Sequence, residues 1–283
     1  RVCAAGQTCR AGACTAVAPS NDTLAGATPI NLAAASSDFT ANTSAATNNV
    51  TIPCVSAGSA TGRDVFFRIT LTRREFVYAD SFGSSYDTAL VFTTSTGAPV
   101  ASQTAGDQVC NDDTAMSCGG DGLHSRVFTV LDPGTWYLVV SGYGSAAGAS
   151  TIHFEHIPAG TGTLATLAAG MSTITGVTST ATAGGLTSAT CGGAGPENAY
   201  WWVTCPATGT SSTFTAEDCD TAAFDTVLYL NTGSGFAACN DDSCGLQSRL
   251  SASYSLAARM HALYVDGWSS TSAGSYTVRV NRP

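Results

Sequence analysis

The sequence Tyr-Asp-Thr-Ala-Leu-Val-Phe at residues 86–92 recurs as Phe-Asp-Thr-Val-Leu-Tyr-Leu at residues 224–230. The same ordered motifs follow each copy: Cys-Asn-Asp-Asp at 110–113 and 239–242, Ser-Arg at 125–126 and 248–249, and Gly-Tyr at 142–143 or Gly-Trp at 267–268. Such repetition predicts two copies of one structural unit. We expect a Cys-rich N-terminal segment at 1–18, a first repeat at 19–158 and a second repeat at 159–283.

Short segments rich in β-branched and aromatic residues, separated by turn residues, predict strands in both copies. We expect them at 64–72, 75–79, 88–93, 126–131, 135–140 and 152–155, and at 199–204, 212–215, 226–230, 249–254, 261–265 and 276–280. The Thr-, Ala- and Gly-rich stretch 161–190 predicts weak edge strands or loop. The expected fold class is therefore all-β, with two tandem antiparallel β-sandwich or jelly-roll domains.

The composition limits the environment and the partners. Charged residues make up 11% of the chain, the net charge is −9, and Lys is absent. Nucleic acid and anionic membrane surfaces are unexpected partners, because both require a basic surface. No apolar run reaches the roughly 18 residues of a membrane span. Eleven cysteines in such a chain favour an oxidising compartment, so we expect a secreted or cell-surface protein.

Comparison of the two copies also suggests which cysteines pair. Two cysteines flank Asn-Asp-Asp in both copies, and a further pair occurs in the second copy alone. We expect three disulfides: Cys110–Cys118, Cys239–Cys244 and Cys205–Cys219. The sequence leaves open the partners of Cys3, Cys9, Cys14, Cys54 and Cys191, and the odd total leaves at least one thiol unpaired within the chain.

The ordered motifs Asp-Thr-x-Leu, Asn-Asp-Asp, Ser-Arg and Gly-Thr-Trp-Tyr-Leu-Val-Val-x-Gly-Tyr resemble those of the bacterial pre-peptidase C-terminal (PPC) domain. This module is appended to secreted proteases and other exported proteins, and it is similar in form to collagenase collagen-binding domains. The resemblance covers 64–155 and 199–280. It weakens at Ala-Ala-Arg-Met (257–260), where the first copy has Asp-Pro-Gly-Thr (132–135). The resemblance implies a noncatalytic, often calcium-associated β-sandwich.

The acidic residues point to calcium. Sixteen of the twenty are Asp, the short carboxylate that suits calcium loops. Calcium takes six to eight oxygen ligands, and clustered carboxylates repel one another unless a cation is bound. We expect Ca²⁺ in each repeat, held by Asp87, Asn111, Asp112, Asp113 and Ser125 in the first and by Asp225, Asn240, Asp241, Asp242 and Ser248 in the second. The alternative is that Asn-Asp-Asp only caps a turn.

Aromatic residues form a second candidate site. Trp201 and Trp202 are adjacent on an expected strand, so one should point inward and the other outward. Tyr143 and Trp268 follow a glycine at equivalent strand ends. These four residues predict a face that stacks on a sugar or grips a peptide, with core or inter-domain packing as the alternative. Catalysis is unexpected, because the chain has no nucleophile motif and His-Phe-Glu-His (153–156) places its imidazoles on opposite faces of a strand.

Together these patterns predict a secreted, noncatalytic, calcium-binding protein that attaches to extracellular protein or polysaccharide. One alternative is a structural surface or fibre subunit that self-associates through sheet edges. The other is the accessory C-terminal region of an exported protease, because the chain begins at Arg1 with an unfinished Cys-rich segment.

Overall fold

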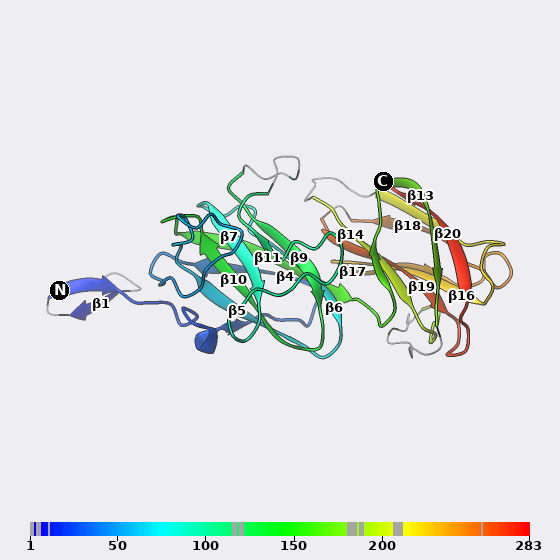
Figure 1. Cartoon of the computed structure of the whole chain (residues 1–283), viewed down its shortest axis with the longest axis horizontal. Coiled ribbons are helices and arrows are strands. Elements are labelled where there is room, and N and C mark those ends of the chain that lie inside the picture. Colours follow the sequence, from blue (N-terminus) through cyan, green and yellow to red (C-terminus); the bar gives the residue numbers. More distant parts are fainter. Residues whose placement is uncertain are drawn as a thin grey trace.

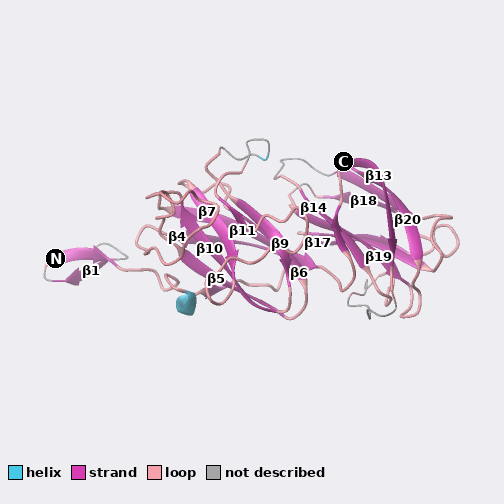
Figure 2. Cartoon of the chain, viewed as in Figure 1, coloured by secondary structure: helices cyan, strands magenta, loops and turns pink. Residues whose placement is uncertain are grey.

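The computed structural model describes residues 1–283 except 1–2, 4–6, 11, 115–117, 119–121, 180–185, 187–189, 206–211 and 256. Strands dominate it (Figure 2), and a small N-terminal hairpin of β1 (Gln7–Arg10) and β2 (Ala13–Ala16) projects from one end (Figure 1). The short 3₁₀ turn η1 (Leu24–Gly26) precedes the first sandwich. Within these described ranges, no helix is long and apolar enough to cross a membrane.

The first sandwich consists of two facing sheets. Sheet I has the order β3 (Thr28–Pro29), β5 (Val65–Leu71), β10 (Gly134–Gly142), β7 (Thr88–Thr93) and β8 (Cys110–Asn111). Sheet II has the order β4 (Ser36–Asn42), β11 (Ala149–Pro158), β6 (Glu75–Asp80) and β9 (Arg126–Leu131). Val65, Phe67, Ile69, Val77 and Phe154 are among the residues that fill the core between the sheets.

The second sandwich repeats this topology strand by strand. Sheet III has the order β12 (Leu164–Thr166), β14 (Asn198–Val203), β19 (Met260–Gly267), β16 (Thr226–Thr232) and β17 (Gly235–Asn240). Sheet IV has the order β13 (Gly170–Val177), β20 (Ser275–Arg282), β15 (Ser212–Glu217) and β18 (Arg249–Tyr254). The predicted fold class, two tandem antiparallel β-sandwiches, is confirmed.

Strand alternation explains why these segments fold as they do. In β18 every second residue, Leu250, Ala252 and Tyr254, is buried in the core, and the residues between them are exposed. In the first sandwich, by contrast, β6 is buried on both faces. A strand that is buried on both sides must be covered by something outside its own sandwich.

The second sandwich provides that cover. Phe76, Tyr78 and Phe128 on the outer face of sheet II share one buried cluster with residues of sheet III, including Trp201 and Tyr264. The Trp201 ring centroid lies 5.5 Å from that of Phe76 and 5.8 Å from that of Phe128. The two sandwiches therefore lie side by side along the long axis of the molecule with an apolar interface between them (Figure 1).

The disulfides differ from the expected pairing. The observed bridges are Cys3–Cys14, Cys54–Cys110, Cys118–Cys205, Cys191–Cys239 and Cys219–Cys244. All three predicted pairings are therefore wrong, although each of the six cysteines is bridged. Cys9 is exposed and free. Five disulfides are consistent with an oxidising compartment.

The geometry of the edge strands explains the error. Cys110 lies on the edge strand β8 and Cys239 on the equivalent edge strand β17. Each is joined to a loop cysteine, Cys54 or Cys191, and shares an apolar cluster with it on the outer face of the sheet. Cys118 instead forms a bridge between the two sandwiches.

Candidate functional site

Three carboxylates approach one another at one end of the second sandwich. Asp225 precedes β16, Asp241 and Asp242 follow β17, and these two strands pair with Leu228 opposite Asn240. Partial burial, followed by the negative charges of Asp242 and Asp241, raises the pKa of Asp225. The like charges are therefore close enough to affect one another, and a bound cation would relieve their repulsion.

The first sandwich has the same arrangement. Asp87 precedes β7, Asp112 and Asp113 follow β8, and β7 pairs with β8 through Leu90 and Asn111. Burial and the charge of Asp112 raise the pKa of Asp113. Strand pairing thus places Asp87 and the pair Asp112 and Asp113, about 25 positions apart in sequence, at the same end of two neighbouring strands.

The Asn of each Asn-Asp-Asp motif bonds to the protein itself. The Asn111 side-chain oxygen accepts a hydrogen bond of 2.9 Å from the Arg126 amide, and that of Asn240 accepts an equivalent bond of 2.9 Å from the Arg249 amide. These bonds fix the turn against the next strand, which is the role that the turn-capping alternative assigns to Asn. If the Asn111 or Asn240 side-chain oxygen also bound calcium, it would do so in addition to this hydrogen bond.

The two predicted serine ligands are fully buried beneath the loops. The Ser125 hydroxyl lies 2.6 Å from the Thr88 carbonyl oxygen, and the Ser248 hydroxyl lies 2.8 Å from that of Thr226. Ser125 also lies 3.0 Å from the Asp112 carbonyl oxygen. The hydroxyls therefore fasten each acidic loop to the start of the neighbouring strand.

The donors at each loop are all oxygen atoms, which is the ligand chemistry that calcium requires. Among the residues that the structure describes, no three or more His, Cys, Asp or Glu side chains are grouped closely enough to hold a metal by themselves. Calcium at these loops stays a prediction, and backbone carbonyl groups would have to complete its coordination.

The predicted aromatic face is only partly exposed. Trp201 and Trp202 are 1% and 2% exposed, so their expected place on a binding face is wrong. Trp202 points into the core of its own sandwich, stacked 5.3 Å from Phe214. Trp201 points outward, but the first sandwich covers it. The packing alternative holds for both residues.

Tyr143 and Trp268, in contrast, are 39% and 48% exposed. The Tyr143 amide donates a hydrogen bond of 3.1 Å to the Asp87 carbonyl oxygen, and the Trp268 amide donates one of 3.1 Å to that of Asp225. The backbone of an exposed aromatic residue is therefore hydrogen-bonded to the first predicted acidic ligand in both sandwiches. The sequence did not reveal that these residues are neighbours.

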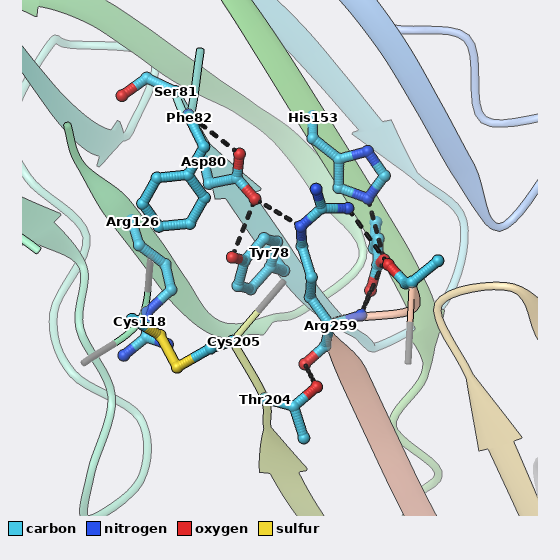
Figure 3. Close-up of polar contacts among 12 residues, drawn as sticks. Tyr78, Asp80, Ser81, Phe82, Cys118, Arg126, His153, Thr204, Cys205 and Arg259 are labelled. Carbon is cyan, nitrogen blue, oxygen red and sulfur yellow. Dashed lines mark hydrogen bonds and ion pairs between the residues drawn. A yellow bond between two sulfur atoms is a disulfide. The ribbon is translucent and has the colours of Figure 1, made fainter. Parts of the chain in front are cut away.

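A buried polar cluster between the sandwiches was not predicted (Figure 3). The Arg259 guanidinium Nε lies 2.8 Å from Asp80 Oδ2. The Glu155 carboxylate accepts hydrogen bonds from the Arg259 amide at 2.9 Å and the Met260 amide at 2.7 Å. The break in the repeat at 257–260 was the signal for this cluster, because Arg259 stands where the first copy has Gly134.

His153 extends the cluster from the first sandwich. Its Nδ1 lies 2.6 Å from Asp38 Oδ1 and its Nε2 lies 2.9 Å from Glu155 Oε1. Burial opposes the charged imidazole, but the hydrogen bonds to Glu155 and Asp38 outweigh it and raise the pKa of His153. Burial also raises the pKa of Asp80, although the charges of Arg259 and His153 act in the opposite direction.

No family model matches the sequence, and no curated protein matches it. Among solved structures, the chain is similar to the pre-peptidase C-terminal domain of a collagenase from Bacillus anthracis, with 12% identity and a TM-score of 0.26 over 42% of this chain and 92% of that chain. It is also similar to the CUB1-EGF-CUB2 domain of human MASP-1/3, with 9% identity and a TM-score of 0.22 over 87% and 99%. It is similar, too, to the ANXUR2 extracellular domain from Arabidopsis thaliana, with 8% identity and a TM-score of 0.21 over 87% of this chain and 89% of that chain. Similarities this distant concern the fold alone.

Proposed function

We propose that this protein is a secreted, noncatalytic module that attaches to extracellular protein or polysaccharide through the acidic end of each sandwich. Each end would hold one calcium ion and present one exposed aromatic residue beside it. The observation that supports this most directly is the pair of equivalent hydrogen bonds, from Tyr143 to Asp87 and from Trp268 to Asp225.

The negative charges of Asp241 and Asp242 act on Asp225, so these carboxylates repel one another. A divalent cation would remove this repulsion and restrain the loops that carry the carboxylates. The backbone of Asp225 would then be fixed, and the Trp268 indole would be fixed with it. An aromatic side chain held in place loses less conformational entropy when it stacks on a ligand, which favours binding.

The test of calcium is thermal unfolding of the intact chain with millimolar calcium and with a chelator. If calcium binds only the folded protein, a concentration one hundred times its dissociation constant adds about 2.7 kcal/mol to the free energy of unfolding. The increase should fall when Asp87 and Asp225 are replaced by Asn, and it should persist in Asp132→Asn, an exposed residue elsewhere. An unchanged midpoint, with no calcium bound by calorimetry, would reduce Asn-Asp-Asp to turn chemistry.

Attachment is tested separately, with insoluble collagen and cellulose as one protein probe and one polysaccharide probe. We expect calcium-dependent retention on one of them and loss of retention in the double variant Tyr143→Ala/Trp268→Ala. Both side chains are exposed, so this variant should retain its unfolding midpoint. Retention that is the same in the variant would reject the aromatic residues as the contact surface.

A further inference from the structure

The outer faces of sheets II and IV are equivalent surfaces with different surroundings. The second sandwich covers the face of sheet II, whereas the face of sheet IV is open. Register pairs identify a corresponding row of four side chains across each face. In sheet II the row is Asp38, His153, Asp80 and Arg126, and in sheet IV it is Thr173, Arg279, Glu217 and Arg249.

In sheet II, residues of this face contact Arg259 and Met260 of the second sandwich. Asp80 holds the Arg259 guanidinium, while Glu155 accepts hydrogen bonds from the amides of Arg259 and Met260. Asp80 in the row and Glu155 beside it thus bind a basic side chain together with the backbone at the start of β19. Inside this one chain, the polar part of the face therefore binds a basic side chain and free backbone amides at the margin of the apolar interface.

In sheet IV the row is more basic, with two guanidinium groups and one carboxylate. Arg279 replaces His153, Asn281 replaces Glu155, and Glu217 takes the place of Asp80. Glu217 lies 2.9 Å from Arg249 and 3.3 Å from Arg279, so one carboxylate faces two guanidinium groups and one net positive charge remains. Both guanidinium groups are well exposed, at 61% and 59%. In a chain of net charge −9, this is a local basic site.

At the corresponding positions, the face of sheet IV lacks the aromatic residues through which sheet II packs against another sandwich. A shallow groove of about 510 Å³ crosses it, and the highly exposed Met171 lies at its side. The aromatic residues Phe76, Tyr78 and Phe128 of sheet II correspond to Thr213, Thr215 and Ser251 in sheet IV. A large apolar partner would bury these hydroxyls without hydrogen-bond partners, whereas the backbone of an extended segment can bond to them.

We propose that the outer face of sheet IV is a docking site for an acidic, extended segment of a partner protein. Carboxylates of that segment would bind Arg249 and Arg279, which can each form paired hydrogen bonds with a carboxylate. The hydroxyls and Asn281 would contact its backbone, and Met171 would cover an apolar side chain. This site is separate from the acidic loops and does not require calcium.

The test uses the intact chain in the presence of a chelator, so that the calcium proposal cannot affect the result. A fluorescein-labelled peptide of about ten residues, alternating Glu and Ser, is long enough to cross the sheet, and its Gln-Ser counterpart is the control. Fluorescence anisotropy should show saturable binding of the Glu peptide at low ionic strength, weakened by salt. The Gln peptide should not bind.

The variant Arg249→Glu/Arg279→Glu should weaken binding of the Glu peptide by about tenfold or more. The matched control Arg63→Glu/Arg68→Glu changes the net charge equally at exposed positions elsewhere and should have a small effect. If the charge reversal perturbs folding, Arg249→Gln/Arg279→Gln provides the same comparison. No saturable binding, or equal losses in both double variants, would overturn the proposal. So would self-association of the chain that the Arg249/Arg279 variant abolishes, because a second copy would then be the occupant.

Discussion

Replacing Arg259 with Met would remove the cation that faces Asp80 while retaining the apolar stem of the side chain. Asp80 is 1% exposed and the Arg259 side chain is 17% exposed, so the pair is largely shielded from water. Breaking a buried ion pair from one side costs about 3–5 kcal/mol, because the remaining charge is left buried. The amide bonds to Glu155 would remain, so we expect a loss of about 3 kcal/mol in the free energy of unfolding at pH 7.

Arg249→Met is the matched control. It removes the guanidinium that pairs with Glu217 on the open face of sheet IV, where the arginine side chain is 61% exposed. Exposed ion pairs contribute about 0–1 kcal/mol, so the control should lie near the wild type. The difference between the two variants isolates the effect of burial.

The loss in Arg259→Met should also depend on pH. Burial already raises the pKa of Asp80 above its usual 3.8, against the charges of Arg259 and His153, and loss of Arg259 would raise it further. A carboxyl with a raised folded pKa is tolerated when protonated and becomes costly as the pH rises through that pKa. The difference in the free energy of unfolding between variant and wild type should therefore be smaller near about pH 4.5 than at pH 7.

Chemical denaturation at both pH values measures these free energies, followed by far-ultraviolet circular dichroism and by tryptophan fluorescence. Trp201, one of four tryptophans, lies in the interface, so the total emission should change when the sandwiches separate. A loss in Arg259→Met no larger than that in Arg249→Met would show that burial of the ion pair does not determine its contribution to stability. So would a loss that is the same at both pH values.

Three further predictions concern the interface and a buried carboxyl. Cys118→Ser/Cys205→Ser opens a bridge of sequence separation 87 and should lower the free energy of unfolding by about 2–4 kcal/mol, measured by calorimetry without reductant; an unchanged midpoint would contradict this. Trp201→Ala should lower the free energy of unfolding by about 3–5 kcal/mol, whereas Trp268→Ala should change it by no more than about 0.5 kcal/mol. Similar losses for the two variants in urea titrations would show that burial does not distinguish these residues. Burial raises the pKa of Asp266 to about 8, so the stability that its neutral form supplies is lost as the pH rises through that value. The stability of Asp266→Asn relative to the wild type should therefore increase between about pH 4 and pH 8. A stability difference independent of pH in a urea series would be inconsistent with this.

Local patterns predicted the strands well, because alternation depends on neighbouring residues alone. The segments 126–131 and 249–254 were predicted with the bounds of β9 and β18. The edge strands β4 and β17 were missed, since strands such as Ser36–Asn42 bury little apolar surface and carry many small polar residues. The same weakness left 161–190 undecided between strand and loop, where β12 and β13 are found.

Contacts across strands and between sandwiches were harder to predict. The alternation of Trp201 and Trp202 placed one side chain outside, but it could not tell that another sandwich covers that side. The cysteines were paired along the chain, as Cys110 with Cys118, whereas in the structure Cys54 and Cys191 bridge to the edge-strand residues Cys110 and Cys239. At the acidic loops the repeat showed that Asp87 and Asp225 occupy one equivalent position, and the calcium ligation predicted there stays a prediction.

Because the outer faces of the two sandwiches differ, the two copies cannot exchange places in the chain without losing their interface. A protein with the copies exchanged would place hydroxyl-rich sheet IV against the capped outer face of sheet I, and it would leave Phe76, Tyr78 and Trp201 in water. Cutting the chain between the sandwiches would expose Phe76 and Tyr78 on one fragment and Trp201 on the other. Exposed apolar patches of this kind promote aggregation. Expression, truncation and domain-transfer experiments should therefore treat both sandwiches as a single indivisible part.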